Sequence, residues 1–134
     1  MATRILLIED DQLVREAYEE ALRGEGFDVE IAADGQEGLN KARLGGYSII
    51  LLDMMLPKID GLGILRGLRQ EPPQVKNGPV LLLTNLSHDP VINQAMDLGA
   101  SAALIKSDID PGLLIESIKA YVAAGGTDGA AGGA

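Results

Sequence analysis

The apolar run from Ser48 to Leu52, which stops at Asp53, constrains the fold of this chain more than any other stretch. A short apolar run bounded by turn residues is typical of a parallel strand that is buried on both faces of a sheet. The acid then lies at the carboxyl end of the strand, where open α/β sheets bind their ligands. Asp53 could also merely end the strand or start a turn, so the other strand ends must decide its role.

The composition describes one acidic globular domain. The chain has 134 residues, of which 46% are hydrophobic, and a net charge of -9. That length suits a single domain, and the acidic charge makes nucleic acid a poor partner. The absence of cysteine excludes disulfides and thiolate metal sites. The first apolar run is far too short for a signal peptide or a membrane span, so we expect a cytoplasmic chain with no membrane contact.

Short apolar runs alternate with amphipathic segments about five times along the chain. The runs predict strands near residues 5–8, 27–31, 48–52, 80–84 and 102–105, and the segments between and after them predict helices starting near 12, 34, 60, 90 and 111. The inner face of the first helix is expected to carry Leu13, Val14, Ala17, Ala21 and Leu22. Alternation of this kind requires parallel strands joined by right-handed crossovers. The predicted fold class is therefore α/β, a doubly wound five-stranded parallel sheet with helices on both faces.

The domain is expected to end before the last ten residues. Residues 1–124 form the predicted domain, whereas residues 125–134 are rich in Gly and Ala and contain no core-forming side chain. We expect this segment to be a flexible tail.

Charged and hydroxyl side chains follow several of the predicted strands. Because the carboxyl ends of parallel strands share one edge of the sheet, these residues should converge: Asp10, Asp11, Asp53, Thr84 and Lys106. Three neighbouring carboxylates repel one another unless a cation lies among them. A set of oxygen ligands without His or Cys favours a hard ion, and Mg²⁺ fits best.

A carboxylate that lies beside Mg²⁺, an ammonium group and a hydroxyl group can act as the acceptor in phosphoryl transfer. In this interpretation Asp53 is the nucleophile, Lys106 neutralises the phosphoryl oxygens and Thr84 donates a hydrogen bond to one of them. Each residue also has a simpler interpretation. Asp11 could serve only as the cap of the first helix, Thr84 could be an ordinary strand residue, and Lys106 could be a solvated charge. These separate structural roles do not explain why all of the residues occur together at the strand ends.

These positions resemble those of the receiver domains of two-component response regulators, the CheY-like family, over roughly Arg4 to Ala123. The marks are the Asp10–Asp11 pair, Asp53, Pro57 and Gly61 after it, Thr84 and Lys106. The resemblance implies the flavodoxin-like strand order 2-1-3-4-5 and a phosphoacceptor role for Asp53. It implies that Asp11, Asp53 and the backbone carbonyl of Met55 bind Mg²⁺, with Asp10 acting through water. It also implies that Thr84 and Lys106 contact the phosphoryl group.

By the same resemblance the chain is a phosphoacceptor signalling domain rather than an enzyme. Its expected partners are a sensor histidine kinase or phosphotransfer protein and a downstream protein target, and it is expected to be a monomer or a weak homodimer. Three positions depart from the family pattern: Asn85 follows the hydroxyl, Ala103 stands where an aromatic residue is usual, and Ser107 replaces a proline.

These departures motivate an alternative, a receiver-like interaction module that signals without phosphorylation. A flavodoxin-like cofactor binder ranks last, because acidic strand ends oppose an anionic cofactor. The chain has no P-loop, and its glycines do not fit the dinucleotide-binding pattern.

Overall fold

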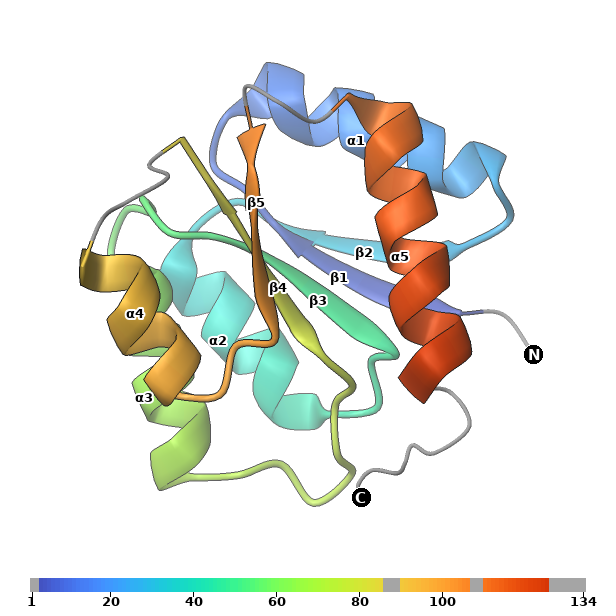
Figure 1. Cartoon of the computed structure of the whole chain (residues 1–134). Coiled ribbons are helices and arrows are strands. Elements are labelled where there is room, and N and C mark those ends of the chain that lie inside the picture. Colours follow the sequence, from blue (N-terminus) through green and yellow to red (C-terminus); the bar gives the residue numbers. More distant parts are fainter. Residues whose placement is uncertain (1–2, 86–89, 107–109, 126–134) are drawn as a thin grey trace.

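The computed structural model describes residues 3–85, 90–106 and 110–125 of the chain, and for residues 124 and 125 the backbone alone. Five strands alternate with five helices (Figure 1). The strands are β1 (Arg4–Ile8), β2 (Asp28–Ala32), β3 (Ile49–Asp53), β4 (Val80–Thr84) and β5 (Ala102–Ile105). The helices are α1 (Gln12–Gly24), α2 (Gly35–Leu44), α3 (Gly61–Gln70), α4 (Pro90–Asp97) and α5 (Pro111–Gly125).

All strand pairs are parallel, and the strand order is β2-β1-β3-β4-β5. This arrangement confirms the predicted fold class and strand order. It also confirms β2 as an edge strand, although β2 begins one residue later than its alternating pattern indicated. The order reverses between β1 and β3, which are neighbours in the sheet, and a reversal of this kind opens a crevice at the carboxyl ends of the strands.

Each central strand is buried because its side chains alternate between two hydrophobic cores. Even-numbered residues such as Leu6, Ile50 and Leu82 pack with residues of α2, α3 and α4. Odd-numbered residues such as Leu7 and Leu51 pack with residues of α1 and α5 on the opposite face. The two groups of helices are seen on either side of the sheet in Figure 1. Continuous apolar runs are therefore the signature of a sheet covered on both faces.

Acidic caps fix the beginnings of several helices. The side chains of Asp34 and Asp60 accept hydrogen bonds from the backbone N–H groups of Glu37 and Gly63, and Asp110 does the same for Leu113. These bonds satisfy donors that the first turn of a helix leaves without a partner. The predicted cap at Asp89 lies outside the described residues, as do residues 126–134 of the predicted tail. The remaining residue of that segment, Gly125, is the last residue of α5.

The predicted inner face of α1 is right for Val14 and Leu22 and wrong for Leu13 and Ala17, which are exposed. Its buried residues are Tyr18 and Leu22, with Val14 packed against the same core, whereas Leu13 is 80% exposed. None of the helices in the described ranges combines the length and the apolar character needed to cross a membrane.

Candidate phosphoacceptor site

Asp53 is the last residue of β3 and is almost completely buried, with 3% exposure. The strand cannot turn this carboxylate towards solvent, because both faces of β3 are covered by the two cores. One oxygen, Oδ1, accepts a hydrogen bond from the backbone N–H of Met55 at 3.2 Å. Asp53 is thus a fixed, poorly solvated carboxylate at the carboxyl edge of the sheet.

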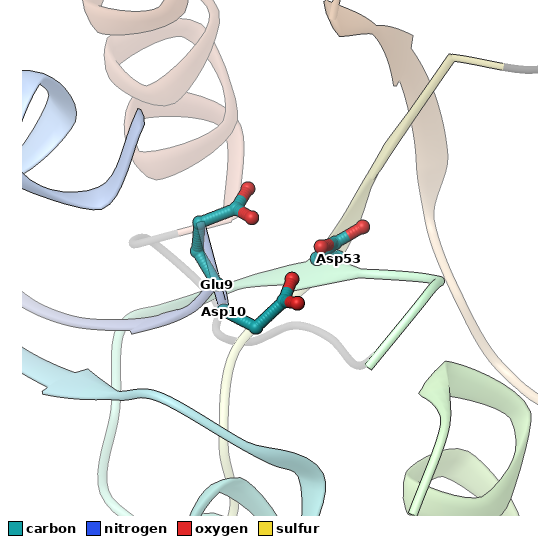
Figure 2. A group of neighbouring side chains, drawn as sticks. All are labelled: Glu9, Asp10 and Asp53. Carbon is teal, nitrogen blue, oxygen red and sulfur yellow. The ribbon is translucent and has the colours of Figure 1, made fainter. Parts of the chain in front are cut away.

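Two acids from the end of β1 lie beside it. Glu9, Asp10 and Asp53 each place a carboxylate oxygen so that the three oxygens lie within 4.8 Å of one another (Figure 2). Glu9 is fully buried and Asp10 is exposed, so the cluster runs from the protein interior to the surface.

Lys106, which follows β5, supplies the positive charge of the site. Its Nζ atom lies 2.6 Å from Glu9 Oε1 and 3.4 Å from Asp53 Oδ2. Thr84, the last residue of β4, is buried and lines a cavity together with Asp10 at the same edge. The structure therefore brings together Asp10, Asp53, Thr84 and Lys106, as the sequence predicted.

The electrostatics of the cluster are unfavourable for a charged Asp53. Burial, together with the charge of Glu9 and a hydrogen bond with it, raises the pKa of Asp53 from 3.8 to about 7 against the opposing effect of Lys106. Burial lowers the pKa of Lys106, but its contacts with Glu9 and Asp53 outweigh burial and leave that pKa raised. Lys106 thus stays an ammonium group, and one cation faces three acids.

The carboxylates fit a hard divalent cation. All of the candidate ligand atoms are oxygens, the preferred donors of Mg²⁺. Three carboxylates and one ammonium group leave a charge of about -2 when all are ionised. A divalent cation would offset the repulsion from Glu9, which adds to the larger effect of burial on the pKa of Asp53.

The sequence placed Asp11 in this cluster, and the structure does not. Asp11 is the N-cap of α1, and its Oδ1 accepts a hydrogen bond from the backbone N–H of Val14 at 3.1 Å. Glu9 takes the expected place. The signal for Glu9 was the strand register: Ile8 pairs with Leu52, so the acid after Ile8 stands beside the acid after Leu52.

The loop after β3, residues 54–60, is held against α2. The backbone N–H of Gly35 donates to the carbonyl of Pro57, and a Cβ atom at Gly35 would lie 1.5 Å from the carbonyl oxygen of Ile59. Lys58, which has a positive φ of 70°, reaches Asp34 Oδ2 at 3.3 Å. These contacts fix the loop that carries Met55.

The three departures from the receiver pattern have different outcomes. Asn85 is exposed directly after Thr84. Ala103 lies on β5 opposite Leu82 and packs against the core below α3 and α4, so this position carries no ring. Ser107 lies outside the described residues.

Comparison with known proteins agrees with the geometry. The model of the response regulator receiver domain family matches residues 5–119. The chain is 40% identical over 102 residues to an uncharacterized transcriptional regulatory protein, YkoG, of Bacillus subtilis, which covers 76% of this chain and 43% of YkoG. It is 38% identical over 104 residues to the response regulator ArlR of Staphylococcus saprophyticus, which covers 78% of this chain and 46% of ArlR. The chain thus spans less than half the length of these relatives.

Solved structures show the same fold. A CheY-like receiver domain protein from Methanospirillum hungatei superimposes with a TM-score of 0.81 at 27% identity, covering 92% of this chain and 96% of that one. The receiver domain of a sensor histidine kinase from Pseudomonas aeruginosa has a TM-score of 0.78 at 26% identity, with coverage of 92% and 99%. That second structure holds a magnesium ion in its active-site cleft.

Proposed function

Because this chain belongs to the response regulator receiver domain family, whose members act in two-component signalling, we propose that Asp53 accepts a phosphoryl group from a histidine kinase in a Mg²⁺-dependent reaction. The observation that carries the proposal is the position of Asp53, a buried carboxylate flanked by two acids and a lysine. Phosphorylation then switches the binding of a downstream protein.

The metal ligands of the proposed site are Asp10, Asp53 and the backbone carbonyl of Met55, with Glu9 acting through water or through Lys106. Asp11 leaves this set because it caps α1. The cation would neutralise charge on the transferred phosphoryl group.

The remaining side chains act on the reacting atoms. A carboxylate oxygen of Asp53 attacks the phosphorus atom, and the bond between phosphorus and the donor breaks. Lys106, already 3.4 Å from Asp53 Oδ2, would move its ammonium group from Glu9 towards the phosphoryl oxygens, and the hydroxyl of Thr84 would donate to one of them.

The partners belong to the proposal as well. They are a sensor histidine kinase or phosphotransfer protein and a protein target, in the cytoplasm, with the chain as a monomer or a weak homodimer. The acidic charge of -9 speaks against nucleic acid binding by this domain.

The test is exposure to acetyl phosphate and Mg²⁺, with the products read by intact mass. The wild type should gain one phosphoryl group, whereas Asp53→Asn and the wild type in the presence of a metal chelator should not. Equal modification of wild type and Asp53→Asn would refute the assignment of Asp53.

One observation favours a second function, an interaction module that signals without phosphorylation. Lys106 lies closer to Glu9 than to Asp53, and Ala103 offers no aromatic side chain to report a change at Thr84. The same mass measurement separates the two functions, since this module would stay unmodified with every phosphodonor.

A further inference from the structure

A cavity of about 520 Å³ opens at the carboxyl edge of the sheet, between the loop after β3 and the beginning of α4. Asp10 and Thr84 line it on the side of the acid cluster. The rest of its wall is mostly apolar and includes Met54, Leu56, Pro57, Leu62, Val91 and Ile92.

The apolar wall is not needed for the transfer described above. A phosphoryl group and a hard cation are both bound by charged and polar groups, which Asp10, Asp53, Thr84 and Lys106 already supply. The volume also lies in the range of pockets that hold small organic ligands, roughly 300–1,000 Å³. An acetyl group would leave most of it unfilled.

We propose that this cavity binds the acyl group of a small acyl phosphate, so that the chain selects phosphodonors with an apolar acyl chain over acetyl phosphate. This inference rests on the proposed role of Asp53. Because attack on phosphorus is roughly in line, the acyl group lies on the side of the phosphorus away from Asp53. The cavity adjoins the acid cluster through Asp10 and Thr84 and extends from there along residues 54–57, so an acyl group bound there would lie next to the reacting atoms.

The reaction balances without another reagent. An oxygen of the Asp53 carboxylate forms a bond to phosphorus, and the bond between phosphorus and the acyl oxygen breaks. The electron pair of that bond leaves with the donor as a free carboxylate anion. No proton or electron is transferred.

Varying the length of the donor's acyl chain measures how much the cavity contributes to the rate of modification of Asp53. Acetate and butyrate are leaving groups of nearly the same strength, so the two acyl phosphates have similar intrinsic reactivity. Each buried methylene group should raise the second-order rate constant about fourfold. Butyryl phosphate, with two more methylene groups, should therefore modify Asp53 about 15-fold faster than acetyl phosphate.

The experiment compares phosphoramidate, acetyl phosphate and butyryl phosphate on the wild-type chain with Mg²⁺, using intact mass against time. A butyryl-to-acetyl ratio of about 15 supports the inference. A ratio below about two, with clear modification by phosphoramidate, overturns the inference and leaves the proposed function standing. Absence of modification by all three donors overturns the proposed function itself and the inference with it.

A pair of variants on α4 ties the preference to the cavity. Ile92 lines the cavity, whereas Met96 on the same helix is 39% exposed and does not. Ile92→Asn should reduce the butyryl-to-acetyl ratio at least threefold, and Met96→Asn should retain the wild-type ratio. Equal ratios in the two variants would show that the preference arises elsewhere. The wild-type ratio decides the matter alone if Ile92→Asn does not fold.

Discussion

Replacing Asp53 by Asn should stabilise the metal-free protein, and the gain should grow with pH. Burial and the neighbouring Glu9 raise the pKa of Asp53 from 3.8 to about 7, so the folded chain holds a proton that the unfolded chain releases. The free energy of unfolding of the wild type therefore falls as the pH rises through this window. The amide side chain of the Asp53→Asn variant cannot ionise, so the variant does not lose this part of its free energy of unfolding as the pH rises.

The magnitude follows from the two pKa values. About three pKa units at about 1.4 kcal/mol each give about 4 kcal/mol between pH values below 3.8 and above 7. Between pH 5 and pH 8 the linkage relation leaves about 3 kcal/mol. This is a large share of the roughly 5–15 kcal/mol that stabilises a typical domain. The ion pair with Lys106 is already contained in the shift, because Lys106 lowers the pKa of Asp53.

Urea unfolding at pH 5, 6, 7 and 8 with a metal chelator measures the effect. The difference in unfolding free energy between Asp53→Asn and wild type should grow by about 3 kcal/mol across that range. Asp97→Asn, at an exposed position on α4, is the matched control and should follow the wild type. A difference for Asp53→Asn that stays constant within about 0.5 kcal/mol would refute the argument that burial and Glu9 oppose the charge of Asp53.

Three further outcomes are expected. Asp10→Asn should weaken Mg²⁺ binding about tenfold or more in calorimetric titrations, because it removes a charged ligand. Asp11→Asn should change the affinity less than twofold, because Asn caps a helix as well as Asp does. The opposite order of the two effects would contradict the placement of Asp11. Glu9→Gln should lower the pKa of Asp53 in an NMR titration of the carboxyl carbon, and an unchanged value would remove Glu9 as a cause. Met55 is 72% exposed beside the site, and its side chain cannot position water by hydrogen bonding. Met55→Asn should therefore speed the decay of phosphorylated Asp53 about tenfold, as measured by intact mass against time. Equal lifetimes in the variant and the wild type would show that Met55 does not shield the site. The sequence also places the apolar residue Leu86 two positions after Thr84, where we expect it to flank the same approach of water, but Leu86 lies outside the described residues.

The arrangement of strands and helices could be predicted because each short apolar run is buried on both faces of the sheet. Even α3, with Gly63 and Gly67 inside it, forms as expected, since Asp60 caps it and Ile64 and Leu65 pack into the core. Glycine weakens a helix in isolation, but burial of the neighbouring side chains outweighs that loss.

The orientation of α1 could not be predicted with the same certainty, because its sequence offers two apolar stripes. Leu13 and Ala17 belong to one, and Val14, Tyr18 and Leu22 belong to the other. Periodicity alone gives both stripes the same helical spacing. The second stripe is buried because α1 packs against α5 and β2, and that choice is made by the tertiary structure.

At the site, the sequence located the strand ends but not the register between them. Three acids in a row follow β1, and the consecutive pair Glu9 and Asp10, rather than alternate residues, comes together with Asp53. The pairing of Ile8 with Leu52 and the cap formed by Asp11 decide which acids face Asp53. Both are features of the folded chain, and a local pattern of residues does not contain them.

The same burial that destabilises Asp53 makes its proposed reactivity conditional on a cation. With a pKa of about 7, a substantial fraction of Asp53 is protonated at neutral pH, and a protonated carboxyl group is a poor nucleophile. A divalent cation at Asp10 and Asp53 would favour the ionised form, because it adds positive charge where Lys106 alone faces three acids. An exposed Asp would be ionised at all times and would react with little dependence on the metal. The buried position at the end of β3 would therefore couple the charge state of the proposed acceptor to the binding of the ion. The fully buried Glu9 would strengthen this coupling, because it lies beside Asp53 without access to solvent.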